Sequence, residues 1–291
     1  MEPIKATLNV VFLGARRCGK SSTLASMIDS LNHSHPNIRV AFANERTETK
    51  MREKDFELRN IFKVGNNNLM WTDDEQGADN DINEYDYDIT ISTYFQVKLH
   101  CVDIPGEKID GDMTVPAELV KKADVIIVAI DTPQLQENGF FGINFNRVNN
   151  VSDLISTTFE GARCSKQLLF VPMKCEKYVH NNSMGQIVQR IKDVYANLIR
   201  YWKIICDIPI HVVPVQTLGD LEFCHFDTKG RTQAAYYKFV GNKNYSPRWC
   251  EQPMIYAINF LINKMPWPMA KDVVSKLKLM RYNVLEKMDL Y

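Results

Sequence analysis

The sequence predicts an α/β fold in which a mostly parallel sheet lies between two layers of helices. Short apolar runs at residues 8–13, 125–130, 168–171 and 208–215 have the length and composition of strands that are covered on both faces. Between them, residues 118–122, 148–159 and 184–205 carry apolar side chains at helical spacing. Because strand and helix alternate along the chain, a parallel sheet with helices on both faces is expected.

Composition limits the class of protein. The 291 residues can bury one substantial core, with or without an appended element, and the 35 basic and 35 acidic residues leave no net charge. This balance argues against nucleic acid or an anionic membrane as the main partner. The N-terminal residues do not form a signal peptide, and no apolar stretch is long enough to span a bilayer. Seven scattered cysteines without a C-x-x-C pair predict reduced thiols in a cytoplasmic protein.

The first apolar run leads into the pattern G-x-x-x-x-G-K-S at residues 14–21, and a helix is predicted directly after it. Such a loop cradles phosphate oxygens with its backbone N–H groups, and the helix N-terminus adds partial positive charge. Lys20 can reach the terminal phosphates, and the Ser21 hydroxyl can bind magnesium. The phosphate-binding residues expected here are Gly14, Arg17, Cys18, Gly19, Lys20, Ser21 and Ser22.

A second motif, Asp103-Ile104-Pro105-Gly106-Glu107, directly follows an apolar strand. Asp103 can hold magnesium through water opposite Ser21, and the N–H of Gly106 can contact a γ-phosphate and release it after hydrolysis. Residues 88–92 and 95–103 are expected to form an antiparallel pair. This pair would add one antiparallel strand to the sheet.

Further motifs follow the next strands: Met173-Lys174-Cys175-Glu176, and the segment 215–218 with Thr217. Together with the first two motifs they resemble the P-loop GTPases of the translation-factor and Ras-like class, whose base-recognition motif is N/T-K-x-D. The resemblance covers residues 8–221 and is greatest to the double-GTPase group of bacterial conflict systems. Glutamate replaces the usual aspartate at Glu176, and methionine replaces asparagine at Met173. A surface charge pair between Lys174 and Glu176 is the alternative interpretation.

The resemblance implies a three-layer P-loop NTPase fold that binds GTP or GDP with Mg²⁺. It implies that Glu176 accepts two hydrogen bonds from guanine, that the Lys174 stem covers the base, and that the backbone near Thr217 contacts it. The expected function is a slowly hydrolysing molecular switch with a protein effector or activating partner, in a bacterial defence or effector complex. Its moving segments would be residues 45–88 and 103–111. A nucleotide-binding scaffold without turnover and an ATP-using P-loop enzyme are the rival hypotheses.

Three candidate residues bear on catalysis: Lys20, Glu107 and Arg16. Glu107 stands where many fast GTPases carry a water-orienting glutamine, and its charge opposes the γ-phosphate, so slow intrinsic turnover is expected. Arg16 or Arg17 could stabilise phosphate charge in cis, or point instead to solvent or to an acidic neighbour. The threonine that completes the magnesium site should be one of four, with Thr72 favoured. The four are Thr47, Thr49, Thr72 and Thr90.

The remaining segments predict the domain organisation. Residues 73–88 carry eight acidic and no basic side chains and are expected to form a solvated loop. Residues 1–265 should form the GTPase domain, with an aromatic-rich insertion at 222–250 that forms a hairpin over the nucleotide, a partner surface or a small core. Residues 266–291 should form an amphipathic accessory helix with a basic face.

Overall fold

The central sheet of the protein has the strand order β2-β4-β5-β1-β6-β7-β8. The computed structural model describes residues 4–34, 38–63, 68–72, 81–92, 95–229, 232–241 and 245–264. The strands are β1 (Ile4–Gly14), β2 (Arg39–Phe42), β4 (Asn83–Ser92), β5 (Phe95–Pro105), β6 (Val125–Asp131), β7 (Gln167–Met173) and β8 (His211–Val212). β4 runs antiparallel to both of its neighbours, β2 and β5, and the other strand pairs described in this sheet are parallel. This confirms a mostly parallel sheet with one antiparallel strand.

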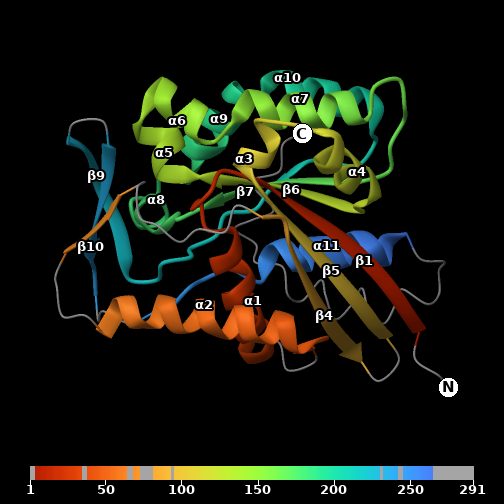
Figure 1. The fold of residues 1–291 in the computed structure, drawn as a ribbon, viewed down its shortest axis with the longest axis horizontal. Helices are drawn as coiled ribbons and strands as arrows, with labels where there is room; N and C mark the ends of the chain where they lie inside the picture. The colour runs from red at the N-terminus through yellow and green to blue at the C-terminus, as the bar shows by residue number, and fades with distance from the viewer. Residues whose placement is uncertain are drawn as a thin grey trace.

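The sheet is the middle of three layers (Figure 1). Along β1, Val10 and Phe12 point into the core on one face, and Val11 and Leu13 into the core on the other. The first face is covered by α1 (Lys20–Ser34), α2 (Glu45–Lys63) and α11 (Gln252–Asn263). The second is covered by α4 (Thr114–Lys122), α7 (Val148–Thr158), α9 (Met184–Val194) and α10 (Ala196–Ile205). The predicted three-layer arrangement is therefore confirmed.

Short helices follow the carboxyl ends of three central strands. They are α3 (Gly106–Ile109) after β5, α5 (Thr132–Glu137) and α6 (Gly139–Phe145) after β6, and α8 (Glu176–His180) after β7. None of these helices has the apolar periodicity of a long amphipathic helix, which explains why the sequence does not reveal them. Together they surround the edge of the sheet at which the phosphate loop lies (Figure 1).

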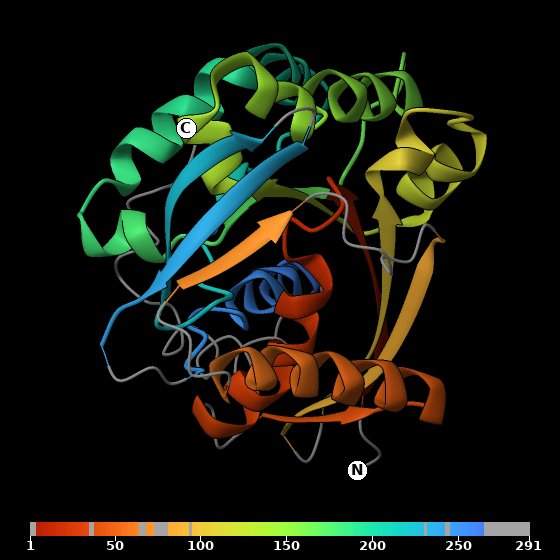
Figure 2. The same cartoon turned by 60° about the vertical axis from the view of Figure 1, so that its left-hand side comes forward.

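A second, antiparallel sheet packs beside the first, in the order β3-β10-β9 (Figure 2). It consists of β3 (Asn68–Thr72), β9 (Leu221–Lys229) and β10 (Thr232–Phe239). Leu221, Phe223 and Tyr237 form a small core here, on which Ile61 and Phe62 of α2 pack. The aromatic-rich insertion thus contains a hairpin with its own core, while β3 depends on a partner strand far along the chain and was not predicted.

Three predicted elements differ in the structure. Residues 83–88 belong to β4 and not to a solvated loop, because Tyr85 and Tyr87 alternate with acidic residues and are buried. The helix expected over 184–205 is divided at Tyr195, whose ring is buried 4.9 Å from that of Phe170. The strand expected over 208–215 is regular only at β8, although the N–H of Val213 still bonds to Phe170 O.

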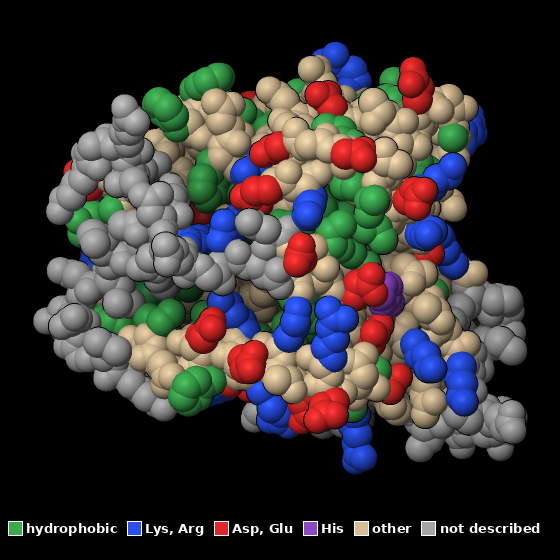
Figure 3. Space-filling view, viewed as in Figure 1, with side chains coloured by type: hydrophobic (Ala, Val, Ile, Leu, Met, Phe, Trp, Pro, Cys, Tyr) green, Lys and Arg blue, Asp and Glu red, His purple; other side chains and the backbone are tan. Residues whose placement is uncertain are grey.

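The predicted helix over residues 266–291 lies outside the described residues. Within the described ranges, no helix is both long and apolar enough to cross a membrane. On the face drawn in Figure 3, basic and acidic side chains are interspersed, as expected for a chain without net charge. Along α2 this mixing takes the form of ion pairs one turn apart, such as Arg52 with Glu48 and Arg59 with Asp55.

Candidate nucleotide-binding site

The register of the sheet brings the sequence motifs to one edge. Gly14, the last residue of β1, pairs with Pro105 of β5 and with Ala129 of β6. On the far side of β6, Asp131 pairs with Met173 of β7. The loops that follow these strands therefore emerge side by side, which is where open α/β sheets bind their ligands.

The phosphate loop has a backbone that glycine makes possible. Gly14 has a φ of +152°, and a Cβ atom there would lie 2.3 Å from the carbonyl oxygen of Ala129. Gly19 has a φ of +115°, and a Cβ atom there would lie 3.3 Å from Met173 Sδ. Arg17 also has a positive φ of 61°. The loop therefore packs directly on β6 and on the base-recognition motif, and α1 begins at its end.

Lys20 lies folded back across this loop. Its ammonium donates hydrogen bonds to Gly14 O at 3.0 Å and Ala15 O at 2.8 Å, and lies 3.5 Å from Asp103 Oδ1. Burial alone would lower the pKa of Lys20, but attraction to Asp103 outweighs it, and the pKa lies above its usual value. The side chain is therefore a buried, charged group held at the centre of the phosphate loop.

Ser21 and Asp103, the two residues predicted to hold magnesium, lie next to each other. The Ser21 hydroxyl donates a hydrogen bond to Asp103 Oδ2 at 3.1 Å. The other carboxylate oxygen, Oδ1, is buried and accepts no hydrogen bond from the residues that the structure describes. A hydroxyl and a carboxylate, whose buried Oδ1 faces only the Lys20 ammonium at 3.5 Å among the described contacts, suit Mg²⁺, which prefers oxygen ligands. The residues present thus fit the ion that the sequence predicts.

The candidate threonines lie apart from this pair. Thr72 is on β3, where it pairs with Ala234, and its side chain is outside the described part of the chain. Thr47 is buried, and its hydroxyl accepts a hydrogen bond from the N–H of Asp86. Thr49 is exposed on α2, and Thr90 lies at the end of β4 away from Asp103. No described threonine side chain joins Ser21 and Asp103.

The remaining loop residues have mixed surroundings. Cys18 is fully buried, and burial raises the pKa of its thiol, which makes it an inert packed side chain. Arg16 and Arg17 are half-buried. Ser22 is half-buried as well, and its carbonyl oxygen accepts a hydrogen bond from Ser26 at 2.9 Å.

The second motif ends β5 and opens α3 at Gly106, which is buried. In Glu107, Oε2 is buried and accepts no hydrogen bond within the described ranges, whereas Oε1 accepts one from Arg147 Nη2 at 3.3 Å. Arg147 lies between α6 and α7 and belongs to no motif. Because it is distant in sequence and meets Glu107 only in the folded chain, sequence reasoning missed it.

Lys174, one of the residues predicted to recognise the base, is held by a partner that the sequence does not reveal. Lys174 has a positive φ of 58°, and its ammonium lies 2.5 Å from Asp131 Oδ2. Asp131, at the end of β6, is 2% exposed and also caps α5 through the N–H of Gln134. Burial opposes the charge of Lys174, but Asp131 outweighs this and raises the pKa. The alternative of an exposed pair between Lys174 and Glu176 is therefore wrong.

Glu176 is buried and turned toward the loop after β8, where its Oε1 accepts a hydrogen bond from the N–H of Leu218. Burial raises the pKa of Glu176 to about 8. In the same loop Thr217 is fully buried, and its hydroxyl makes no hydrogen bond to any described residue. Tyr237 of β10 lies against Lys174, so the second sheet borders this end of the site.

The three-layer fold and the loop geometry define a protein of the P-loop GTPase class. A model of the family described as Double-GTPase 2 matches residues 9–203, which is more than half of the chain, and the chain belongs to that family. This confirms the resemblance that the motifs indicate.

Solved structures show more distant similarity. One is Sup35 complexed with GDP, with 14% identity and a TM-score of 0.38 over 74% of this chain and 38% of that one. Another is the Ski7 GTPase-like domain of S. cerevisiae bound to GTP, with 14% identity and a TM-score of 0.41 over 91% of this chain and 52% of that one. The chain thus spans about half or less of either structure. No curated protein matches it.

Proposed function

We propose that this protein is a Mg²⁺-dependent, GTP-binding molecular switch that hydrolyses GTP slowly. One observation carries the proposal. Three buried polar atoms make no hydrogen bond to any described residue: Asp103 Oδ1 near the end of β5, Glu107 Oε2 on α3 and Thr217 Oγ1 in the loop after β8. Of these, Asp103 Oδ1 lies 3.5 Å from the Lys20 ammonium. All three belong to the segments that surround the phosphate loop. Buried polar atoms are rarely left unpaired, and a nucleotide with its ion and water would supply the missing partners.

In this proposal the backbone of residues 14–21 holds the phosphates, with the help of Lys20. Lys20 now bonds to two loop carbonyl oxygens, so it can exchange these bonds for phosphate oxygens without leaving the loop. Ser21 and Asp103 would hold magnesium, which supplies positive charge to the phosphates. Thr72 remains the proposed third ligand, and Gly106 the proposed γ-phosphate contact.

Guanine would lie beside Lys174, Glu176 and Thr217. The stem of Lys174 is held in place because Asp131 fixes its ammonium, which suits a side chain that covers a flat ring. Glu176 supplies an acceptor for the two donors of guanine, and binding them favours its charged form. Selection of GTP over ATP therefore depends on the buried carboxyl of Glu176, whose ionised form is stabilised when guanine binds.

Hydrolysis is proposed to be slow because Glu107 brings negative charge toward the γ-phosphate. Lys20 and Glu107 are the proposed catalytic residues, with Arg16 as a third candidate that would act on phosphate charge. A switch with slow turnover needs an activating partner, so we propose that a protein effector or activator binds this chain. Family membership supports a place in a bacterial defence or effector complex. We also propose a GTPase domain over residues 1–265 and an accessory helix over 266–291.

Chromatographic measurement of GDP formed from GTP under single-turnover conditions tests this function. We expect slow conversion that needs Mg²⁺ and is absent with ATP. Tight GTP binding without any GDP formation would favour the scaffold hypothesis. Conversion of ATP at the same rate would favour the ATP-using enzyme and contradict the proposal.

A further inference from the structure

Arg147 stands at a tight corner between α6 and α7. Its backbone is left-handed, with φ 51° and ψ 40°. Residues other than glycine and asparagine seldom adopt this conformation. The residue is nevertheless largely buried, with 19% of its side chain exposed. Strained conformations of this kind persist where surrounding contacts hold them, and they cluster at functional sites. The contacts of the Arg147 side chain therefore decide what the corner does.

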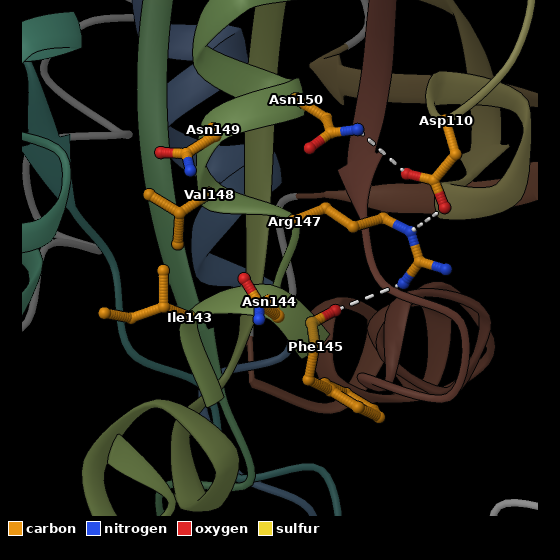
Figure 4. Close-up of a pocket in the computed structure, with 8 residues that line it drawn as sticks. All are labelled: Asp110, Ile143, Asn144, Phe145, Arg147, Val148, Asn149 and Asn150. Carbon is orange, nitrogen blue, oxygen red and sulfur yellow. Dashed lines mark hydrogen bonds and ion pairs between the residues drawn. The ribbon is translucent and has the colours of Figure 1, made fainter. Parts of the chain in front are cut away.

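Two of the three hydrogen bonds of this side chain reach the segment that follows Asp103. Nε donates to Asp110 Oδ2 at 2.9 Å, and Nη2 donates to Glu107 Oε1 at 3.3 Å. Nη1 donates to the carbonyl oxygen of Phe145 at 3.2 Å, which fixes the guanidinium from its own side (Figure 4). Arg147 thus contacts both ends of α3 with one planar group.

The same guanidinium covers Gly106. A Cβ atom on Gly106 would lie 2.5 Å from Arg147 Cδ and 2.6 Å from its Nε. Gly106 is therefore the residue that lets the arginine lie flat on the start of α3. Its N–H is also the group proposed to contact the γ-phosphate. If Gly106 moves toward or away from a nucleotide, it must move along the Arg147 side chain.

The residue before the arginine joins the corner to the other end of the site. Asn146 is fully buried; its Oδ1 accepts from the N–H of Asp131 at 2.7 Å, and its Nδ2 donates to Asp131 O at 3.3 Å. Asp131 in turn holds the ammonium of Lys174. Two adjacent residues thus connect the proposed base site to the proposed γ-phosphate site through hydrogen bonds and ion pairs.

We propose that Arg147 is a positioning residue for GTP hydrolysis, which holds Gly106 and neutralises Glu107 while Asn146 ties it to the base side. The inference rests on the proposed function. An unpaired Glu107 carboxylate would place a full negative charge near the γ-phosphate and the attacking water. Its ion pair with Arg147 reduces this repulsion. The hydrogen bonds described for the arginine reach Glu107, Asp110 and Phe145 and not Lys20, Ser21 or the base residues, so it acts through α3.

The corner is also open to the outside. Asp110, Ile143, Phe145 and Arg147 help to line a cavity of about 410 Å³ beside α3, and Asn150 donates to Asp110 at 3.1 Å across its rim (Figure 4). The guanidinium can therefore leave Glu107 without unpacking the core of the second face. Arg147 can therefore hold α3 in one state and release it in another.

The test compares Arg147→Ala and Arg147→Lys with the wild type, and uses Arg190→Ala as the matched control. Arg190 is a half-buried arginine on the same face of the sheet, and its Nε donates a hydrogen bond to Leu135 O and not to α3. Fluorescent GDP and a non-hydrolysable GTP analogue report binding, and single-turnover GDP formation reports hydrolysis. Thermal unfolding is measured for every variant.

We expect Arg147→Ala to lower turnover by about tenfold while its GDP affinity stays within about twofold of the wild type, because GDP has no γ-phosphate for Gly106 to contact. Arg147→Lys keeps the charge and should recover part of the loss. Adding Glu107→Gln to Arg147→Ala should also recover turnover, since no charge is then left to neutralise.

Two outcomes would overturn the inference. Turnover of Arg147→Ala equal to that of Arg190→Ala and the wild type would show that the corner does not act on hydrolysis. Equal loss of GDP and GTP-analogue affinity with a lower melting temperature would assign Arg147 a structural role only. Failure of the wild type itself to bind or convert GTP would contradict the proposed function instead, so the two failures are distinguishable.

Discussion

The hydroxyl of Ser21 donates a hydrogen bond to Oδ2 of Asp103 across 3.1 Å. The two residues come from the phosphate loop and from the end of β5, which lie next to each other because β1 and β5 pair in parallel over their full length. The hydroxyl and the carboxylate thus lie within hydrogen-bond distance of each other. An ion between them would replace that bond by two oxygen ligands, which is the arrangement that the proposed function requires.

Lys20→Ala should strongly weaken nucleotide binding, or abolish turnover, without unfolding the chain. The ammonium bonds only to loop carbonyl oxygens and to Asp103 in the described contacts, so its loss removes charge from the site and little from the core. We expect binding to weaken by about 3 kcal/mol or more, as for lost charged hydrogen bonds. Fluorescence titration with GTP measures this, with Lys54→Ala on α2 as a control. A folded Lys20→Ala variant with wild-type affinity would rule out the phosphate-loop assignment.

Glu176→Ala should weaken GTP far more than ATP. If the carboxylate accepts the two donors of guanine, its removal costs a few kcal/mol of binding, roughly the value for charge-assisted hydrogen bonds. Competition titrations with both nucleotides give the ratio of affinities. Equal binding of GTP and ATP by the wild type would remove this role from Glu176 and favour an ATP-using enzyme.

Glu107→Gln should hydrolyse GTP at least as fast as the wild type. Glutamine keeps an acceptor for the attacking water and removes the charge that opposes the γ-phosphate, and Arg147 keeps its bond to Asp110. Single-turnover GDP formation is the measurement, with the exposed Glu118→Gln on α4 as the matched control. A large loss of activity would mean that the carboxylate itself is required.

The free energy of unfolding of the nucleotide-free protein should decrease as the pH rises, because of Glu176. Burial raises the pKa of this carboxyl from its ordinary 4.5 to about 8, so the folded state holds a proton that the unfolded state has lost. Its contribution is fully present below pH 4.5 and is lost as the pH rises toward 8, by up to about 1.4 kcal/mol per unit. Urea unfolding at several pH values should show this slope reduced in Glu176→Gln. If the free energy of unfolding changes with pH by the same slope in both proteins, the Glu176 carboxyl is in a more polar environment than the structure shows.

The sequence predicts the elements whose signal is local. The phosphate loop follows from the spacing of Gly14, Gly19 and Lys20, and the central strands follow from their apolar runs. The alternation of Tyr85 and Tyr87 with acidic residues is also a signal for strand β4. The density of negative charge in the same segment favoured the prediction of a loop.

Other parts of the site depend on contacts between distant residues. Asp131 ends an apolar run before Thr132 and Pro133, a pattern typical of a helix cap, and it does cap α5. That it also holds Lys174 follows only from the pairing of β6 with β7. The contact of Arg147 with Glu107 depends on how the corner before α7 packs against α3 and has no signature in either segment.

Calorimetric titration of the wild type with GTP, GDP and a non-hydrolysable ATP analogue, each with and without Mg²⁺, tests the central claim most directly. We expect one site that binds GTP and GDP much more tightly than the ATP analogue, and that binds GTP more tightly when Mg²⁺ is present. Binding that ignores both the base and the ion, or no binding of GTP at all, would contradict it.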